Sequence, residues 1–177
     1  MEQKVNPWKT NLANGLILGL VGVVYSLLIY FLNLSFNKVQ GYVSILIQIT
    51  LLYFLLKSYR DNYLHGQITY GQSVGAGVII FLYYAVIMAV FTYILNAFID
   101  TGLAAKQLAF AEEAMVKKGM PQAAIDTAMA MQAKFMKPGI MSILVIFGSL
   151  FYGVILSLLI SIFIKKEGNP LIDTPAN

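Results

Sequence analysis

Four long stretches without a charged residue constrain what this chain can fold into. They cover residues 10–37, 39–56, 66–99 and 139–164. The hydrocarbon core of a bilayer requires about 20 predominantly apolar residues in a helix. Backbone groups within lipid must also bond inside their own segment, which excludes loops and open strands. The sequence therefore predicts an all-α integral membrane protein, with transmembrane helices over about 12–34, 39–56, 74–98 and 139–164.

The composition agrees with lipid as part of the solvent. Hydrophobic residues make up 59% of the chain and charged residues only 11%, whereas about a quarter of an ordinary soluble domain is charged. We treat residues 1–177 as one domain. The first apolar stretch is longer than the core of a secretory signal, and no small-residue cleavage pattern follows it, so we expect a retained first helix.

Small residues recur at helical spacing in three of the expected spans, where they permit close approach of helices within lipid. We expect them to pack the four helices together, with homodimerisation as the alternative. A polar stripe of Gln40, Ser44 and Gln48 marks the second span, and an unbonded amide at Gln48 would be costly near mid-membrane. We expect Gln48 to bond a neighbouring helix. The candidate packing residues are Gly15, Gly19, Gly22, Ser26, Gln48, Gly71, Gly75, Ser149, Gly153 and Ser157, with Gly77 and Ser161 extending two of the patterns.

The link between the third and fourth spans, residues 100–138, has a helical pattern of its own. Asp100 or Thr101 can cap a helix that runs to about Lys118, and Pro121 suits the first turn of a second helix. The pattern predicts an extramembrane amphipathic hairpin, antiparallel and sealed by two apolar faces at 4-3-4 spacing. The hairpin would either stand above the bundle or lie in the headgroup layer. The faces are Ala104, Leu108, Ala111 and Met115 on the first helix, and Ala124, Ala128, Met131 and Phe135 on the second.

Five methionines fall in this link, and two readings of them stay open. Thioethers such as Met129 and Met131 can hold Cu(I), but no cysteine or histidine accompanies them. Methionine also fills adaptable binding surfaces. We favour a face that binds a partner.

The orientation depends on the cations near the span ends. One side would hold Lys4, Lys9, Lys57, Arg60, Lys165 and Lys166. The other would hold Lys38, Lys106, Lys117, Lys118, Lys134 and Lys137. Most of the second set lies inside the long link and is partly offset by carboxylates. We therefore expect both termini in the cytoplasm and residues 100–138 on the outer face.

Residue types that perform chemistry are scarce. No ionisable residue lies inside a predicted span, whereas proton relays and ion sites normally require one there. His65 is the only histidine and the chain has no cysteine, so the sequence predicts no cofactor and no metal site. The glycines between Gly71 and Gly77 lack the Lys-Ser/Thr ending of a phosphate loop. No basic stripe indicates nucleic acid. We expect a protein that is not an enzyme.

A short polar segment between the second and third spans carries a family resemblance. The pair Arg60-Asp61 is followed by Gly66-Gln67-Ile68-Thr69-Tyr70-Gly71-Gln72, and the long link holds Lys118-Gly119-Met120 and, before a proline, Phe135. These features resemble a bacterial membrane family known as domain of unknown function 4199. The resemblance implies a small four-helix inner-membrane protein without assigned activity. It also suggests a polyprenyl-phosphate glycosyltransferase as a partner.

These observations favour an accessory subunit that binds another membrane or envelope protein, or a second copy of itself. The alternative is a transporter or flippase component for a neutral or lipidic solute, which would use the stripe at Gln48. Several residues are candidates for interaction, although tyrosines and cations at span ends also serve as interfacial anchors. They are Tyr59, Arg60, Asp61, Tyr63, Tyr70, Gln72, Met129 and Phe135.

Overall fold

A computed structural model describes residues 5–167, so Lys4, which was counted for orientation, lies outside the described residues. The elements in chain order are α1 (Pro7–Phe31), α2 (Lys38–Tyr63), α3 (Tyr70–Ile94), a π-helical turn η1 (Leu95–Ile99), α4 (Leu103–Lys117), α5 (Gln122–Phe135) and α6 (Pro138–Ile164). The described part of the chain contains no strand and only one isolated bridge, between Ile68 and Lys166. The prediction of an all-helical protein is confirmed.

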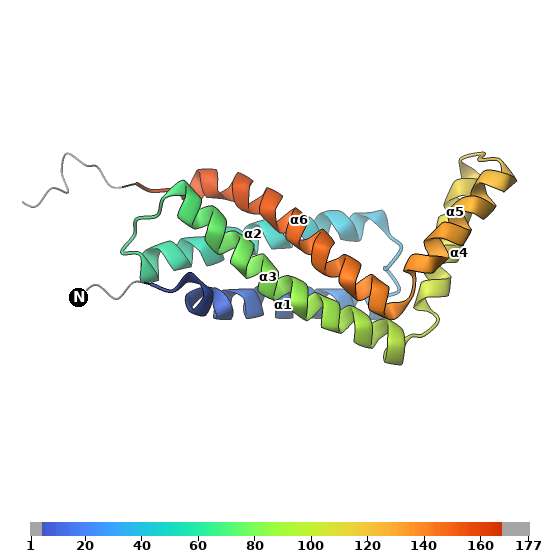
Figure 1. The fold of residues 1–177 in the computed structure, drawn as a ribbon, viewed down its shortest axis with the longest axis horizontal. Coiled ribbons are helices and arrows are strands. Elements are labelled where there is room, and N and C mark those ends of the chain that lie inside the picture. The colour runs from blue at the N-terminus through green and yellow to red at the C-terminus, as the bar shows by residue number, and fades with distance from the viewer. Residues whose placement is uncertain (1–4, 168–177) are drawn as a thin grey trace, which may run out of the picture.

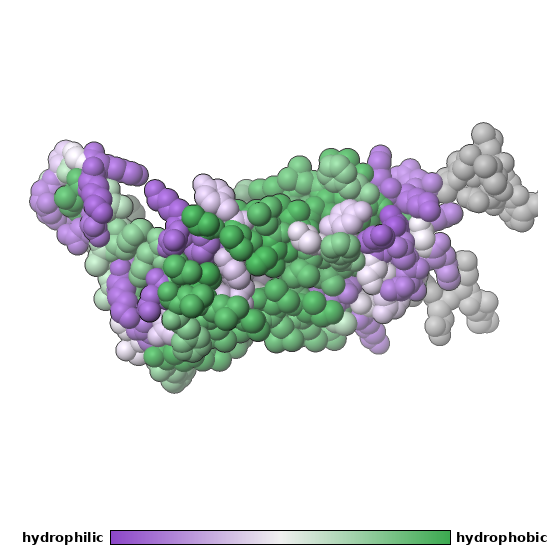
Figure 2. Space-filling view, turned by 180° about the vertical axis from the view of Figure 1, so that it is seen from behind, coloured by the Kyte–Doolittle hydropathy of each residue, from purple (hydrophilic) through white to green (hydrophobic). Residues whose placement is uncertain are grey.

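Four helices are long and apolar enough to cross a membrane: α1, α2, α3 with η1, and α6. The shortest has 25 residues, which gives roughly 38 Å at 1.5 Å per residue and exceeds the roughly 30 Å hydrocarbon core. Apolar residues cover the middle of the face seen in Figure 2, and polar residues gather towards its two ends. The architecture is that of a multi-pass membrane protein.

The ends of these helices differ from the predicted spans. The second helix extends to Tyr63, so Arg60 and Asp61 lie in its last turn rather than in a polar link. The third helix begins at Tyr70 rather than near residue 74. Charge-free windows find the part of a helix that suits hydrocarbon, whereas a helix continues into headgroups and water wherever its backbone bonds are satisfied.

Helix α3 occupies the centre of the packing, with its most extensive contacts to α6 and α1. α1 approaches α3 through glycines: a Cβ on Gly15 would meet the Tyr83 side chain, and one on Gly19 would meet Ile87. On the opposite side, Gly153 of α6 lies against Phe81. Because helices in lipid gain no hydrophobic drive from association, such backbone-to-side-chain contacts supply their packing energy.

Helix α2 enters the core through its second half, whereas its first half meets α1 through a hydrogen bond from the Tyr25 hydroxyl to the Gln40 carbonyl, at 2.6 Å. Its buried residues are Leu52, Leu55, Leu56 and Tyr59, and the first half contributes none. These side chains enter the core cluster beside Leu18, Ile68 and Ile164. The core is therefore deepest towards the end of the molecule where α1 begins and α6 ends (Figure 1).

The helices α4 and α5 pack against each other and project obliquely from the opposite end (Figure 1). Helix α4 begins at Leu103 after Gly102, and neither Asp100 nor Thr101 caps it. Asp100 instead accepts from the backbone N–H of Gly102, at 3.1 Å, in a turn that precedes the helix. The expected capping position was therefore wrong by one or two residues. In the turn between α4 and α5, Gly119 has a φ of +71° and adopts the left-handed conformation that follows the end of a helix.

The face of α5 that turns towards α4 differs from the predicted one. Ile125 is buried at 1% exposure, and Ala128 and Met129 are half-buried, whereas Met131 is 58% exposed and Phe135 is 47% exposed. The prediction that Met131 and Phe135 line the inner face was wrong. Ile125, in the first turn of α5, is the one branched aliphatic side chain of this helix and takes the buried position.

Candidate functional site

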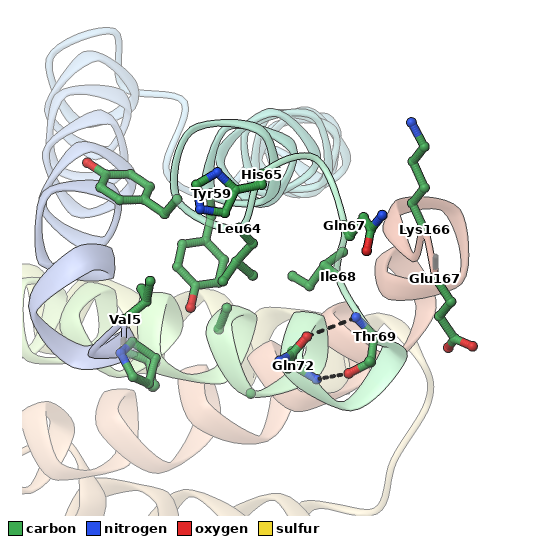
Figure 3. Close-up of a pocket in the computed structure, with 15 residues that line it drawn as sticks. Val5, Tyr59, Leu64, His65, Gln67, Ile68, Thr69, Gln72, Lys166 and Glu167 are labelled. Carbon is green, nitrogen blue, oxygen red and sulfur yellow. Dashed lines mark hydrogen bonds between the residues drawn. The ribbon is translucent and has the colours of Figure 1, made fainter. Parts of the chain in front are cut away.

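A pocket of about 890 Å³ opens at the end of the molecule where α1 begins, α2 ends and α3 begins. Its volume lies within the range of small-molecule sites, about 300–1,000 Å³. We call it the end pocket. Its lining is Val5, Pro7, Tyr59, Tyr63, Leu64, His65, Gln67, Ile68, Thr69, Gln72, Gly75, Ala76, Ile79, Lys166 and Glu167 (Figure 3).

The segment that resembles the family builds one wall of this pocket. The carbonyl of Arg60 accepts from the N–H groups of Leu64 and Gly66, at 3.2 and 3.0 Å, and so closes α2. His65 and Gly66 have φ of +53° and +80°, which reverses the chain there. The left-handed region is easy for Gly66, which has no Cβ. This turn is a close-packed corner rather than a free loop.

A capping box then starts α3 beside the pocket. The Thr69 hydroxyl accepts from the N–H of Gln72, at 3.3 Å, and the Gln72 side chain accepts from the N–H of Thr69, at 3.0 Å (Figure 3). This reciprocal pairing satisfies two amides at the start of the helix. Gln72, which we expected to bind a partner, therefore fixes the first turn of α3.

Three contacts hold the same segment to α6. The backbones of Ile68 and Lys166 exchange two hydrogen bonds, at 2.9 and 3.0 Å. The Arg60 guanidinium donates to the carbonyl of Ile164, at 3.0 Å, and to Asp61 at 2.7 Å. The Tyr70 hydroxyl donates to the carbonyl of Leu158, at 3.1 Å. Arg60 and Tyr70 thus have structural partners and are half-buried, whereas Asp61, Tyr63 and Gln72 are exposed.

Tyr59 differs from the other candidates. The residue is only 4% exposed and its ring lines the end pocket. Its hydroxyl has no hydrogen-bond partner among residues 5–167. Among the described residues the fully buried side-chain polar atoms without a partner are the Asn96 Oδ1 and the Tyr152 hydroxyl, so the Tyr59 hydroxyl reaches the open space of the pocket. The tertiary structure therefore places an unpaired polar group at the pocket, where the sequence suggested a surface anchor.

The pocket changes in polarity along α3. His65, Gln67, Lys166 and Glu167 lie at the mouth, and Ala76 and Ile79 lie further along α3 inside the apolar part of the chain. Ten residues separate Thr69 from Ile79, or roughly 15 Å at 1.5 Å per residue. The site is thus an amphipathic pocket that runs from charged residues to apolar ones.

The candidate packing glycines divide into two groups. Gly15, Gly19, Gly22 and Gly153 each lie against a side chain of α3, and Ser157 faces Gly77. At Gly71 and Gly75 an added Cβ would meet nothing within 4 Å. These two glycines do not make close helix contacts, and Gly75 lines the end pocket instead. Ser26 and Ser149 are half-buried.

A buried serine pair was missed as a unit. The Ser161 hydroxyl of α6 donates to the Ser73 hydroxyl of α3, at 2.8 Å, and both residues are 0% exposed. Ser161 extends a small-residue pattern that the sequence shows, but Ser73 lies just before residue 74, where we expected the third span to begin. Recognising Thr69-x-x-Gln72 as a capping box would have placed Ser73 on the helix.

The polar stripe on α2 bonds within its own helix. The Gln48 amide donates to the Ser44 hydroxyl, at 3.0 Å, rather than to a neighbouring helix. The adjoining cavity between α1 and α2 measures about 10 Å³. That is close to the minimum for a single water molecule, and it is far smaller than a solute path.

Asp100 anchors the α4–α5 pair at the far end of the molecule. Its carboxylate accepts from Lys106 at 2.8 Å, from the N–H of Gly102 at 3.1 Å and from the Tyr30 hydroxyl at 3.4 Å. The hydrogen bond from Lys106 is the main cause that holds the pKa of Asp100 below its ordinary value. The loop after α1 also contacts α4, because the rings of Phe36 and Phe110 stack with centroids 5.1 Å apart.

Comparisons with known proteins give a family and nothing further. The model of a family described as "Protein of unknown function (DUF4199)" matches residues 13–166. The match covers the four long helices almost completely, so the resemblance seen in the sequence is confirmed. No curated protein and no solved structure matches the chain.

Proposed function

Since the chain belongs to the family of unknown function whose model it matches, we propose that it is a non-enzymatic membrane subunit that binds another membrane or envelope protein. The binding surface is the outer flank of α5, which we define as Ala124, Met131 and Phe135. This proposal rests on one observation: three of the four residues in the apolar stripe expected inside the α4–α5 pair are exposed on its outside, and only Ala128 is half-buried.

The outer flank has the composition of a protein-binding surface. Met131 and Phe135 are 58% and 47% exposed and lie one helical turn apart, with Ala124 exposed on the same side. Methionine and aromatic residues are enriched in the cores of protein interfaces. Met side chains also adapt to the shape of a partner.

A protein suits this flank better than hydrocarbon. The α4–α5 pair projects away from the four long helices (Figure 1). Glu112, Glu113, Lys117, Lys118 and Asp126 lie on the same two helices or at their connection, and the structure leaves all five exposed. Burying these charges in lipid would be costly without partners. Water therefore surrounds the pair until a partner covers its apolar flank.

For the topology we propose a bacterial inner membrane, with both termini in the cytoplasm and residues 100–138 extramembrane on the outer face. The support is that described cations at the terminal side, such as Lys57, Arg60, Lys165 and Lys166, adjoin span ends directly. Reporter fusions after Lys118 and at the C-terminus test this orientation. A periplasmic signal from the C-terminal fusion would reverse it.

Site-specific photocrosslinking in intact membranes tests the partner proposal. We expect a photoreactive residue at position 131 to give a discrete protein adduct. The same probe at Ala130, which is exposed on the other flank of α5, should give none. A Phe135→Glu variant should abolish the adduct, because it places a charge in the apolar contact. An adduct of twice 19.6 kDa would indicate a second copy, and lipid adducts alone would indicate a membrane contact; either overturns the proposal.

A further inference from the structure

We propose that the end pocket binds an anionic phospholipid, with the headgroup phosphate at Tyr59 and the start of the acyl chains against Ala76 and Ile79. This site lies at the opposite end of the molecule from the α4–α5 pair. The inference is therefore independent of the proposed partner surface.

The Tyr59 hydroxyl supplies the specific contact. The residue is 96% buried, lines the pocket and has no hydrogen-bond partner among the described residues. The hydroxyl reaches the open space of the pocket rather than a sealed interior, so it is free to donate to a ligand in place of water. A phosphate oxygen is a charged acceptor, and hydrogen bonds to charged groups are about twice as strong as those between neutral groups.

The shape of the pocket matches an amphipathic ligand. Polar and charged residues line its mouth, and Val5, Ala76 and Ile79 line its inner part. A free inorganic anion has no apolar surface to bury against the inner wall. A phospholipid has both parts in one molecule, and the roughly 15 Å from Thr69 to Ile79 accommodates a headgroup, a glycerol and the first methylenes.

The charge around the mouth favours an anion. The neighbouring ends of α2 and α6 carry Lys57, Arg60, Lys165 and Lys166, against the carboxylates of Asp61 and Glu167. This leaves two positive charges in excess among the described residues of these ends. Of these charged groups only Lys166 and Glu167 line the pocket itself, so the positive excess lies around the mouth, where it attracts an anionic headgroup.

The aromatic residues place the pocket at headgroup depth. Trp8 and Tyr63 are 50% and 47% exposed at this end, in the manner of an interfacial belt. Lys57 of α2 follows directly on the apolar stretch of that helix. A lipid in the adjoining leaflet therefore meets the pocket without leaving the membrane.

Two glycines of α3 provide a matched pair of variants. At both Gly71 and Gly75 a Cβ meets nothing within 4 Å, so leucine introduces no clash with the backbone or a packed side chain. Only Gly75 lines the pocket. Leucine also forms helix better than glycine, so both variants should fold. Gly75→Leu fills the pocket, and Gly71→Leu controls for added apolar surface.

The experiment titrates the full chain in a non-ionic detergent with phosphatidylglycerol and counts bound lipids by native mass spectrometry. We expect one retained phosphatidylglycerol, with phosphatidylcholine retained at least tenfold less. Gly75→Leu should reduce retention at least tenfold and Gly71→Leu should leave it unchanged. Tyr59→Phe, which removes only the hydroxyl, should weaken binding about tenfold.

The remaining outcomes overturn the proposal. Equal retention by the Gly75→Leu and Gly71→Leu variants would show that lipid binds elsewhere on the surface. Equal retention of the two lipids would remove the anionic headgroup as the recognised feature. Displacement of phosphatidylglycerol by millimolar inorganic phosphate would assign the pocket to a soluble phosphate compound rather than to a lipid.

Discussion

Replacing Gly153 with alanine tests the contact on which the α3–α6 packing depends. A Cβ at this position would overlap the first two carbons of the Phe81 side chain and lie 2.8 Å from its Cδ1. The Phe81 ring cannot move aside easily, because it is 0% exposed and meets Tyr84 and Tyr152 in edge-to-face contacts. Gly148 lies on the same helix with nothing within 4 Å of an added Cβ, and it provides the matched control.

The magnitude follows from two opposing contributions. Alanine is more favourable than glycine inside a helix by roughly 0.5–1 kcal/mol, and both variants gain this. An extra methyl in a close-packed interior costs about 1–3 kcal/mol, and only Gly153→Ala carries that cost. The helix contribution cancels in the comparison. We therefore expect Gly153→Ala to be less stable than Gly148→Ala by about 1–3 kcal/mol.

Equilibrium unfolding in mixed micelles of increasing dodecyl sulfate content, followed by circular dichroism, measures this difference. Gly148→Ala should unfold at or above the wild-type midpoint and Gly153→Ala clearly below it. A second change, Phe81→Ala, removes Cγ and the ring and leaves only Cβ of the overlapping atoms, so the double variant should show a favourable coupling energy. If both alanine variants shift the midpoint equally, the close approach of α6 to Phe81 is wrong.

Two further perturbations test polar contacts at different ends of the molecule. Ser161→Ala removes the donor to Ser73 and should lower the free energy of unfolding by about 1 kcal/mol in the same assay; no loss would mean that the pair contributes nothing. The depressed pKa of Asp100 means that its ion pair with Lys106 is intact above the ordinary value of 3.8 and is lost as pH falls through the lower folded value. Spin labels on cysteines introduced at positions 33 and 130 of this cysteine-free chain should therefore show a broader distance distribution in acid, and Asp100→Asn should show it already at pH 7. A distribution that is independent of pH in the wild type would contradict the anchoring role.

The long helices could be predicted because hydrocarbon imposes a local requirement. Each stretch without charge satisfies it by itself, and all four became helices. Their ends were less accessible: α2 continues through Arg60 and Asp61, which find partners in each other and in the carbonyl of Ile164. The Ile164 carbonyl comes from α6, 104 residues away in sequence, so no local pattern predicts that contact.

The candidate site was only half visible in the sequence. We expected the segment from Arg60 to Gln72 to bind a partner. In the structure its side chains make hydrogen bonds that close the turn between α2 and α3 and attach it to α6. Tyr59 lies near the end of a predicted span, which is typical of an interfacial anchor. In the structure the surrounding helix ends bury it beside the end pocket. Burial depends on what the other three helices bring to the same place.

The sequence by itself determined that lipid surrounds this protein and how many long helices it has. The free energy of transferring a helix to hydrocarbon is a sum over residues that are near each other in the chain. Tertiary structure alone decided which faces are used. Gly15 and Gly75 both belong to patterns of small residues, yet Gly15 lies against Tyr83 and Gly75 has nothing within 4 Å of an added Cβ. On α5, Ile125 rather than Met131 is the buried residue. Such choices depend on shape complementarity between helices, and neither helix encodes the shape of the other.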